Sequence, residues 1–382
     1  MRAALLLFLV LVDLLFAHSA YAQTIVPQNR IVLFDGTSLN GLYPWFSTSG
    51  FSDPDQVFRV ERGMLHVTGN GWGALITNSE YRNFVMVLEF KWGSRTWGKR
   101  QGKAKDAGLL FHSRGIEGGW KGLLMPSIQA QMMDGSTGDV ILLQGVDSGG
   151  ATLPISVTSN VEQVASGVNP PNWNYREGYR WKPGNHQITI NQDEESIHWS
   201  GWDPHWKDVE GYRGQTALES PDGHWNQLVV IADDDTFELF LNGTKVNEGA
   251  RVVPSEGKLQ LEVELSEFFV RRWELWPIGH AVGPIITVDT IPGGISGLNY
   301  SQAVGAKGVS ALTWSIASGS LPPGLVLNPA TGEINGTPTT VGTYSFSVRV
   351  KDAAGEQATQ PLQIAVASCG GGLAQYVRCW MN

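Results

Sequence analysis

Alternating hydrophobic and polar positions are clearest between residues 106 and 143. Two runs in this stretch predict β-strands, because successive side chains of a strand face opposite sides of its sheet. In the first run, His112 is expected on the same face as Leu110 and opposite Phe111. The second run has one mainly polar and one apolar face, formed by Gln129, Gln131 and Met133 and by Ile128, Ala130 and Met132, respectively. Such strands are predicted to line a binding cleft or, more simply, to keep one face in water.

Short apolar runs separated by Gly, Asp, Asn and Pro continue from residue 31 to residue 278. The pair Asn242-Gly243 lies between two such runs and predicts a tight hairpin, since both residues accept positive φ. For the acidic residues 233–235, a solvated hairpin is favoured over a calcium site. No helical apolar period persists over three turns. Many antiparallel strands in one stretch predict an all-β fold of two packed sheets, a sandwich or jelly roll.

The amino-acid composition agrees with this fold class and excludes some kinds of binding partner. The 382 residues include 46 Gly and 15 Trp, and only 16% are charged, as is typical of β-proteins with many turns. Most of the Trp side chains are expected to fill the core, while others offer flat faces to sugar rings. The net charge is −9 and no cluster of Lys and Arg occurs, so nucleic acid and anionic membranes are not expected partners.

The two ends of the chain predict export. Residues 1–22 combine Arg2, an apolar run and the small-residue ending Ala20-Tyr21-Ala22, which predicts a secretory signal peptide. An uncleaved anchor is the alternative, although the run is short for a membrane span. After cleavage no span remains, and the protein is expected to be periplasmic, secreted or bound to the cell surface. A Cys369–Cys379 disulfide is predicted in the tail, residues 368–382, because disulfides persist in exported chains.

The amino-acid composition of the sequence changes after residues 279–284. Ser, Thr, Gly and Pro dominate the following segment, and its short alternating runs predict a small immunoglobulin-like sandwich at residues 284–367. The run LPPGLVLNPATGEINGTPTTVGTYSFSVRVKD, residues 321–352, resembles the immunoglobulin-like repeats of bacterial secreted proteins. This resemblance implies a spacer or adhesion module without chemistry of its own.

Residues 23–280 contain seven motifs in this order: LFDGTSLNGLYPW, AGLLFHSRG, MPSIQAQMMDGSTGDVILL, DPHWKDVEGYRG, SPDGHWNQLVV, LNGTKVNEG and GKLQLEVELSEFFVRRWELWPI. By these motifs and their order, the segment resembles the 3-keto-disaccharide hydrolase family, formerly a domain of unknown function. The resemblance implies a concanavalin-like jelly roll and, as ligand, a glycan or an oxidised disaccharide. Two positions depart from the family pattern, because Gln129 and His224 stand where the family usually has Glu.

The resemblance also implies a kind of chemistry. A sugar oxidised at carbon 3 has an acidic hydrogen at carbon 2, so a base can expel the glycosidic oxygen by elimination. The candidate bases are His112, Glu264 and His224, since imidazole and carboxyl groups take up protons near neutral pH. The enolate oxygen needs a cation or hydrogen-bond donor, for which Arg114 and Lys121 are candidates. His and carboxylate groups also suit a divalent metal ion, but no tight ligand spacing occurs.

Further polar residues are candidates for holding the sugar. Gln129 and Gln131 can both donate to and accept from sugar hydroxyls, or can be solvated strand residues. Asp139 is a third candidate, although an Asp beside a Gly-rich turn commonly caps the backbone. His112 and Arg114 also have ordinary structural explanations, as a hydrogen-bonded strand residue and as a surface ion pair.

Two functions therefore follow from the sequence. The first is an exported enzyme that cleaves 3-keto-glycosides by elimination or hydrolysis. The second is a non-catalytic carbohydrate-binding or adhesion protein, which the two missing Glu residues favour. Retaining glucanases also place two carboxylates on one strand face, as Glu262 and Glu264 do here. Because the run around this pair resembles the closing strand of the 3-keto-disaccharide family, ordinary glycosidase chemistry ranks below these two.

Overall fold

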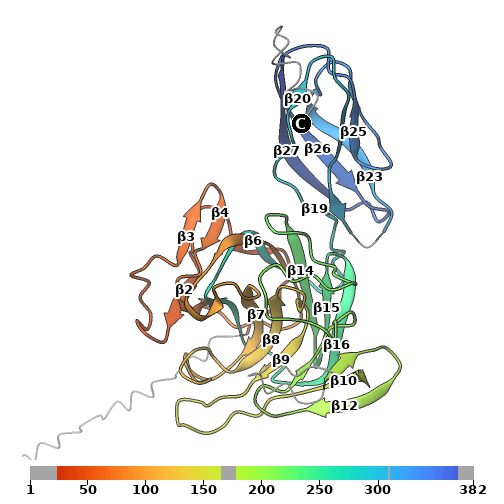
Figure 1. Ribbon diagram of the computed structural model, residues 1–382. Helices are drawn as coiled ribbons and strands as arrows, with labels where there is room; N and C mark the ends of the chain where they lie inside the picture. Colours follow the sequence, from red (N-terminus) through yellow and green to blue (C-terminus); the bar gives the residue numbers. More distant parts are fainter. Residues whose placement is uncertain (1–23, 165–177, 309, 369–382) are drawn as a thin grey trace, which may run out of the picture.

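The computed structural model describes residues 24–164, 178–308 and 310–368. These residues form two β-sandwiches and a single 3-10 turn, η1 (Gly98–Arg100), so the all-β prediction is confirmed. The smaller sandwich extends from one end of the larger one, near β14 (Figure 1). The predicted signal peptide and the predicted Cys369–Cys379 disulfide lie outside the described residues.

The larger domain has two sheets. Within the described residues, the first sheet has eleven strands: β11 (Tyr179–Trp181), β10 (Ser156–Gln163), β16 (Thr244–Val253), β15 (Thr236–Leu241), β14 (Asn226–Asp233), β6 (Phe84–Thr96), β18 (Ser266–Trp276), β4 (Met64–Val67) and β3 (Phe58–Glu61), with β12 (His186–Ile190) beside β10 and β1 (Ile31–Phe34) beside β18. The second has seven: β13 (Ser196–Ile197), β9 (Val140–Leu143), β8 (Ser127–Met133), β7 (Asp106–Ser113), β17 (Lys258–Glu264), β5 (Trp72–Thr77) and β2 (Leu42–Phe46). This is the expected jelly-roll sandwich.

The core lies between these two sheets. Strand β8 turns Ile128, Ala130 and Met132 into it, and all three are fully buried in one cluster with Phe84, Met86 and Leu88 of β6. Gln129 and Gln131 therefore lie on the opposite face of β8, as the alternation of the sequence predicts. We call the face of the seven-stranded sheet that packs on the core its inner face, and the other its outer face.

Both predicted hairpins are present. Asn242 and Gly243 have φ of 52° and 83° and join β15 to β16, with Leu241 paired to Thr244. This is the backbone that a two-residue hairpin turn requires. Asp234 has φ of 48° and lies in the turn between β14 and β15, where Asp233 pairs with Thr236.

The smaller domain has its own core around Trp314, Ile334, Phe346 and Val348. Its strands, within the described residues, are β19 (Ile285–Ile286) with β22 (Ala306–Lys307), β20 (Gly294–Ile295) with β27 (Gln357–Ala367), β26 (Gly342–Lys351) and β23 (Thr313–Gly319), and β21 (Tyr300–Ala303) with β25 (Glu333–Gly336) and β24 (Leu325–Leu327). Separate cores are what two independently packed sandwiches require.

Polar contacts join the two domains. The Asp289 carboxylate pairs with Lys91 and accepts a hydrogen bond from Trp225 Nε1 at 2.5 Å. Arg271 Nη2 donates to the carbonyl of Ile286 at 2.9 Å. No helical segment among the described residues is long and apolar enough to cross a lipid bilayer.

Candidate functional site

The outer face of the seven-stranded sheet carries a line of polar side chains along β17. Leu259, Leu261 and Val263 point into the core, so Glu262 and Glu264 point outward. Glu262 pairs across the sheet with Ala74 of β5 on one side and Gly108 of β7 on the other. Two carboxyl groups are thereby fixed on one rigid strand, two residues apart.

Gln129 and Gln131 of β8 connect this pair to β7. Gln129 Nε2 donates to Glu262 Oε2 at 3.0 Å and also to the side-chain oxygen of Gln131. Gln131 Nε2 donates to Asp106 Oδ1 at 2.8 Å. The indole of Trp72 donates to the other oxygen of Glu262 at 3.2 Å. Both oxygens of Glu262 are therefore held in place by fixed donors.

Arg100 of η1 supplies the positive charge. Its guanidinium is 1% exposed, pairs with Asp106 and lies 3.0 Å from Glu264 Oε1 and 3.4 Å from Asp208 Oδ1. A planar guanidinium suits this position because it donates several hydrogen bonds in fixed directions. We call the set Arg100, Asp106, Gln129, Gln131, Glu262 and Glu264 the acid cluster.

All six residues of the acid cluster are at most 6% exposed, and Lys99 lies beside them at the molecular surface. The Lys99 side chain is 53% exposed, and its ammonium lies 3.5 Å from Glu264 Oε1 and 3.7 Å from the centre of the half-buried Trp72 ring. A cation over an indole face is favourable, and Lys is long enough to move off it without backbone change. Lys99 is thus the exposed cation nearest to Glu264.

Gly108 makes room for the acid cluster. A Cβ at this position would lie 2.5 Å from Glu262 Oε2 and 2.7 Å from Gln129 Nε2. Carbon atoms do not approach such groups so closely, so a larger residue at position 108 would displace the ends of the Glu262 and Gln129 side chains from their present contact. The glycine at the centre of the site is explained by this contact rather than by its backbone angles.

Both outward carboxyls of β17 hold protons more tightly than usual. Burial raises the pKa of Glu262 to about 8, and the neighbouring charge of Glu264 adds to this. Burial also raises the pKa of Glu264, while Arg100 and Lys99 oppose the shift. A carboxyl that is protonated at neutral pH can donate its proton, and one stabilised by cations can accept one. Glu262 therefore has the properties of a general acid, and Glu264 is the neighbouring carboxyl whose raised pKa is opposed by two cations.

Of the predicted site residues, the structure brings together Gln129, Gln131 and Glu264. His112 does not share the face of Leu110, contrary to the prediction from alternation. Its φ of 54° interrupts the strand geometry, and its ring lies edge-on to Phe111 and Phe84 at 5.1 and 6.0 Å. The ring is 0% exposed. This position is out of reach of a ligand on the outer face.

The burial of His112 predicts a pH-dependent loss of stability. Burial lowers its pKa to about 4 from 6.5, and the carbonyl of Pro254 opposes this only in part. The unfolded chain therefore binds the proton first as pH falls from 6.5 to 4, which removes about 3 kcal/mol of unfolding free energy. Urea unfolding at pH 7 and pH 4 measures this change. In His112→Phe, the unfolding free energy should fall less between pH 7 and pH 4 than it does in the wild type. The exposed His186→Phe is the control, and an identical fall in His112→Phe and wild type would contradict the prediction.

The two predicted cations lie elsewhere in surface ion pairs. Arg114 pairs with Glu256 and lies 3.0 Å from Glu80 Oε2, at the edge of a pocket of about 450 Å³ near Pro254. Lys121 lies 2.6 Å from Glu194 Oε1 and 3.3 Å from Asp193. The cations next to Glu264 are instead Lys99 and Arg100.

Asp139 and His224 also have local partners. Asp139 is buried and accepts hydrogen bonds from His198 Nδ1 and from the backbone N–H of Trp199, both at 2.8 Å. Its contacts are those of a residue that holds the chain after β13. The half-buried ring of His224 lies 3.2 Å from the carbonyl of Asp222. Their roles as substrate-binding residue and base remain predictions.

The acid cluster does not have the arrangement of a metal site. Among the described residues, no group of three His, Cys, Asp or Glu side chains is placed to hold a metal ion. In the acid cluster, Arg100 occupies the space between Asp106 and Glu264 and already neutralises their oxygens. We therefore derive no step through a metal ion.

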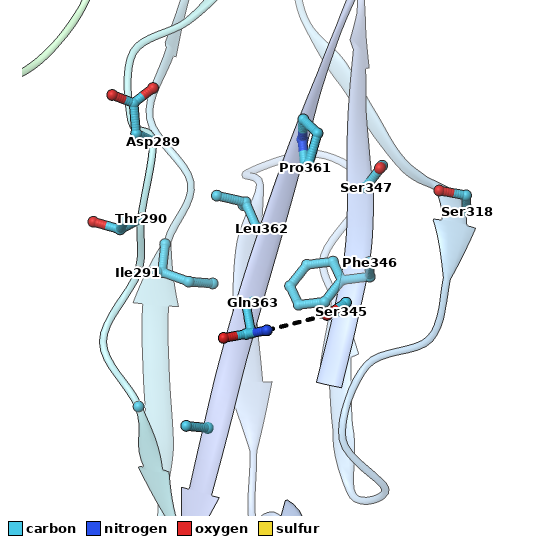
Figure 2. Close-up of a pocket in the computed structure, with 12 residues that line it drawn as sticks. Asp289, Thr290, Ile291, Ser318, Ser345, Phe346, Ser347, Pro361, Leu362 and Gln363 are labelled. Atoms are coloured by element: carbon cyan, nitrogen blue, oxygen red, sulfur yellow. Dashed lines mark hydrogen bonds between the residues drawn. The ribbon is translucent and has the colours of Figure 1, made fainter. Parts of the chain in front are cut away.

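A larger pocket, of about 650 Å³, lies on the smaller domain (Figure 2). Apolar and small polar side chains of β26 and β27 line it, among them Phe346, Leu362 and Ser347, and Gln363 donates to Ser345 Oγ at 3.2 Å within it. Its one ionisable lining residue is Asp289, which the contacts to Lys91 and Trp225 occupy. It therefore lacks the acid and base that the outer face of the larger domain supplies.

The fold and the acid cluster define a jelly-roll domain with a buried acid pair, joined to an immunoglobulin-like domain. Residues 29–275 match the family described as the 3-keto-alpha-glucoside-1,2-lyase-like domain, and the chain belongs to this family. Residues 283–367 match the "Putative Ig domain" family. Both resemblances inferred from the motifs are thereby confirmed, and the chain belongs among carbohydrate-related hydrolase-like domains.

Three solved structures contain chains that are similar to this one. Two "putative glycosyl hydrolases" from Parabacteroides distasonis are 17% and 14% identical, with TM-scores of 0.36 and 0.35. Each alignment covers 65% of this chain, and 94% and 99% of the respective structures. The carbohydrate-binding module CBM66 from Bacillus subtilis is 10% identical over 55% of this chain and 84% of the module, with a TM-score of 0.28. No curated protein sequence matches the chain.

Proposed function

We propose that this protein cleaves 3-keto-glycosides by 1,2-elimination at the acid cluster. The observation that carries the proposal is the pair of outward carboxyls on β17, one with a pKa raised to about 8 and the other beside two cations. An elimination needs one group that accepts a proton and one that donates a proton at the same pH. The family match supports the class of substrate.

In the proposed reaction, Glu264 removes the hydrogen from carbon 2 of the oxidised ring. The electrons of that C–H bond form the double bond between carbons 1 and 2, as the bond from carbon 1 to the glycosidic oxygen breaks. Glu262 gives its proton to the departing oxygen. The charge that develops on the carbon-3 oxygen during this step is stabilised by Lys99, the exposed cation 3.5 Å from Glu264. Water then adds to the double bond.

The other members of the acid cluster position the two carboxyls. Gln129 and Trp72 hold the oxygens of Glu262, and Arg100 holds Glu264 against Asp106. Gln129 is a neutral donor here, whereas a carboxylate at this position would repel Glu262. The departure from the family pattern at residue 129 is therefore compatible with the proposed acid role of Glu262. The segment at residues 1–22 supports export as part of the proposal.

A direct assay tests this proposal. Purified protein incubated with a chromogenic 3-keto-glucoside, with and without divalent metal, is expected to release the aglycone. The matching unoxidised glucoside should not react, because its carbon-2 hydrogen is not acidic. Absence of release under all metal conditions, together with retained sugar binding, would contradict the enzyme and favour the non-catalytic carbohydrate-binding function.

A further inference from the structure

We propose a second binding site at the edge of the outer face, where the exposed ring of Phe51, held by Tyr43 and Trp45, stacks against the sugar ring on the leaving-group side of the substrate. This inference rests on the proposed function of the acid cluster and adds the residues that hold the second ring of the substrate.

Three aromatic rings gather at the β2 edge of the seven-stranded sheet. Phe51 lies 5.0 Å from Trp45 and 5.9 Å from Tyr43, measured between ring centres. Phe51 is 61% exposed, and the other two are half-buried. An exposed aromatic ring held by two others offers a rigid apolar surface at little cost in side-chain entropy, which suits the C–H face of a pyranose.

The pairing of strands connects this aromatic group to the acid cluster. Trp45 and Glu262 both pair with Ala74, from opposite sides, and Trp45 belongs to the same outer-face cluster as Ala74. Two strand spacings separate Trp45 from Glu262, roughly 10 Å between their backbones. Ala74, the residue between them, is small and fully buried. A ligand that contacts both groups would have to span this distance, which needs more than one sugar ring.

The order of residues along β17 shows on which side of the acid cluster the aromatic group lies. Glu264 pairs with Trp72, and the strand runs back through Glu262 towards Lys258. Lys258 Nζ donates to the Tyr43 hydroxyl at 2.7 Å. The aromatic group therefore lies on the side of Glu262, the proposed acid, and away from the proposed base. This is the side on which the departing oxygen carries its second ring.

Polar side chains lie next to the aromatic group, as they do in carbohydrate-binding sites. The Tyr43 hydroxyl donates to Glu117 Oε1 at 2.6 Å, and Lys258 completes the set. These side chains are about one-fifth exposed, so they can exchange hydrogen bonds with ring hydroxyls. The apolar ring face and the polar border together fit a carbohydrate rather than a purely apolar ligand.

Calorimetric titration with maltose and with methyl α-glucoside, neither of them oxidised, tests the site without turnover. Phe51→Ala is expected to weaken maltose binding about tenfold and to leave methyl α-glucoside unchanged. Phe51→Tyr should keep wild-type affinity because it keeps the ring. Val326→Ala, which truncates a 62% exposed side chain of the smaller domain, is the matched control.

Three results would overturn the site: equal affinity of the wild type for the two sugars, maltose binding unchanged in Phe51→Ala, or equal weakening of both sugars in that variant. Failure of the proposed reaction is a separate result. It would appear as absence of aglycone release from the 3-keto-glucoside while the difference between maltose and methyl α-glucoside persists.

Discussion

Replacing Glu264 by Gln is expected to lower kcat for aglycone release from a 3-keto-glucoside by about 10²–10⁴-fold. This is the range that a positioned general base contributes. Gln keeps the size of the side chain and its contact to Arg100, but it cannot accept the carbon-2 proton. The matched control is Glu333→Gln in the smaller domain, where the side chain accepts a hydrogen bond from Ser301. Wild-type kcat in Glu264→Gln would remove Glu264 from the base role.

The pH profile separates the acid from the base. The pKa of Glu262 is raised to about 8, so the wild-type rate should fall as pH rises through this value and the acid loses its proton. Protonation of Glu264, whose pKa is also raised by burial, should lower the rate as well, because the protonated carboxyl cannot act as base. Glu262→Gln removes the titrating carboxyl. In this variant the rate should be lower than in the wild type and should no longer fall at high pH. An unchanged fall near pH 8 in this variant would contradict the assignment.

Replacing Arg100 by Met is expected to lower the unfolding free energy by about 3–5 kcal/mol. Arg100 lies among three carboxylates, Asp106, Glu264 and Asp208, and its removal leaves buried negative charges without a partner. Urea unfolding followed by tryptophan fluorescence measures the change. Lys121→Met is the control, because that ammonium pairs with Asp193 and Glu194 on the surface and should contribute less than about 1 kcal/mol.

The effect of Arg100→Met should also depend on pH. Loss of Arg100 raises the pKa of Glu264 further, because Arg100 is the first of the charges that oppose its rise. A carboxyl whose folded pKa lies above its unfolded value destabilises the fold at high pH and no longer does so below its unfolded pKa. The difference in unfolding free energy between wild type and Arg100→Met should therefore become smaller as pH falls towards about 4. A difference that is constant between pH 7 and pH 4 would show that lost packing, rather than charge, causes the destabilisation.

Much of the larger domain follows from alternation alone. The faces of Gln129 and Gln131, the shared face of Glu262 and Glu264, and the hairpin at Asn242-Gly243 are all present as predicted. These features are local, because the side-chain period of a strand and the positive φ of a turn depend on neighbouring residues. The motifs then identified the family, and with it the strands that carry the site.

The same reasoning was wrong for the face of His112. Alternation holds only where the strand is regular, and a φ of 54° at His112 turns its ring against Phe84 and Phe111. Arg114 and Lys121 are near His112 in the sequence, but each has a carboxylate partner from a distant segment. Charge type and sequence distance do not fix which ion pair forms.

The sequence by itself determined two β-sandwiches, the family, and the residues that point outward from β8 and β17. Only the tertiary structure decided that η1 brings Arg100 and Lys99 to Glu264, that Gly108 leaves space for the bond between Gln129 and Glu262, and that Trp45 lies across Ala74 from the same carboxyl. The physical reason is that strand periodicity is a property of adjacent residues. The protonation and partners of a buried carboxyl depend instead on charges that the fold brings from far along the chain.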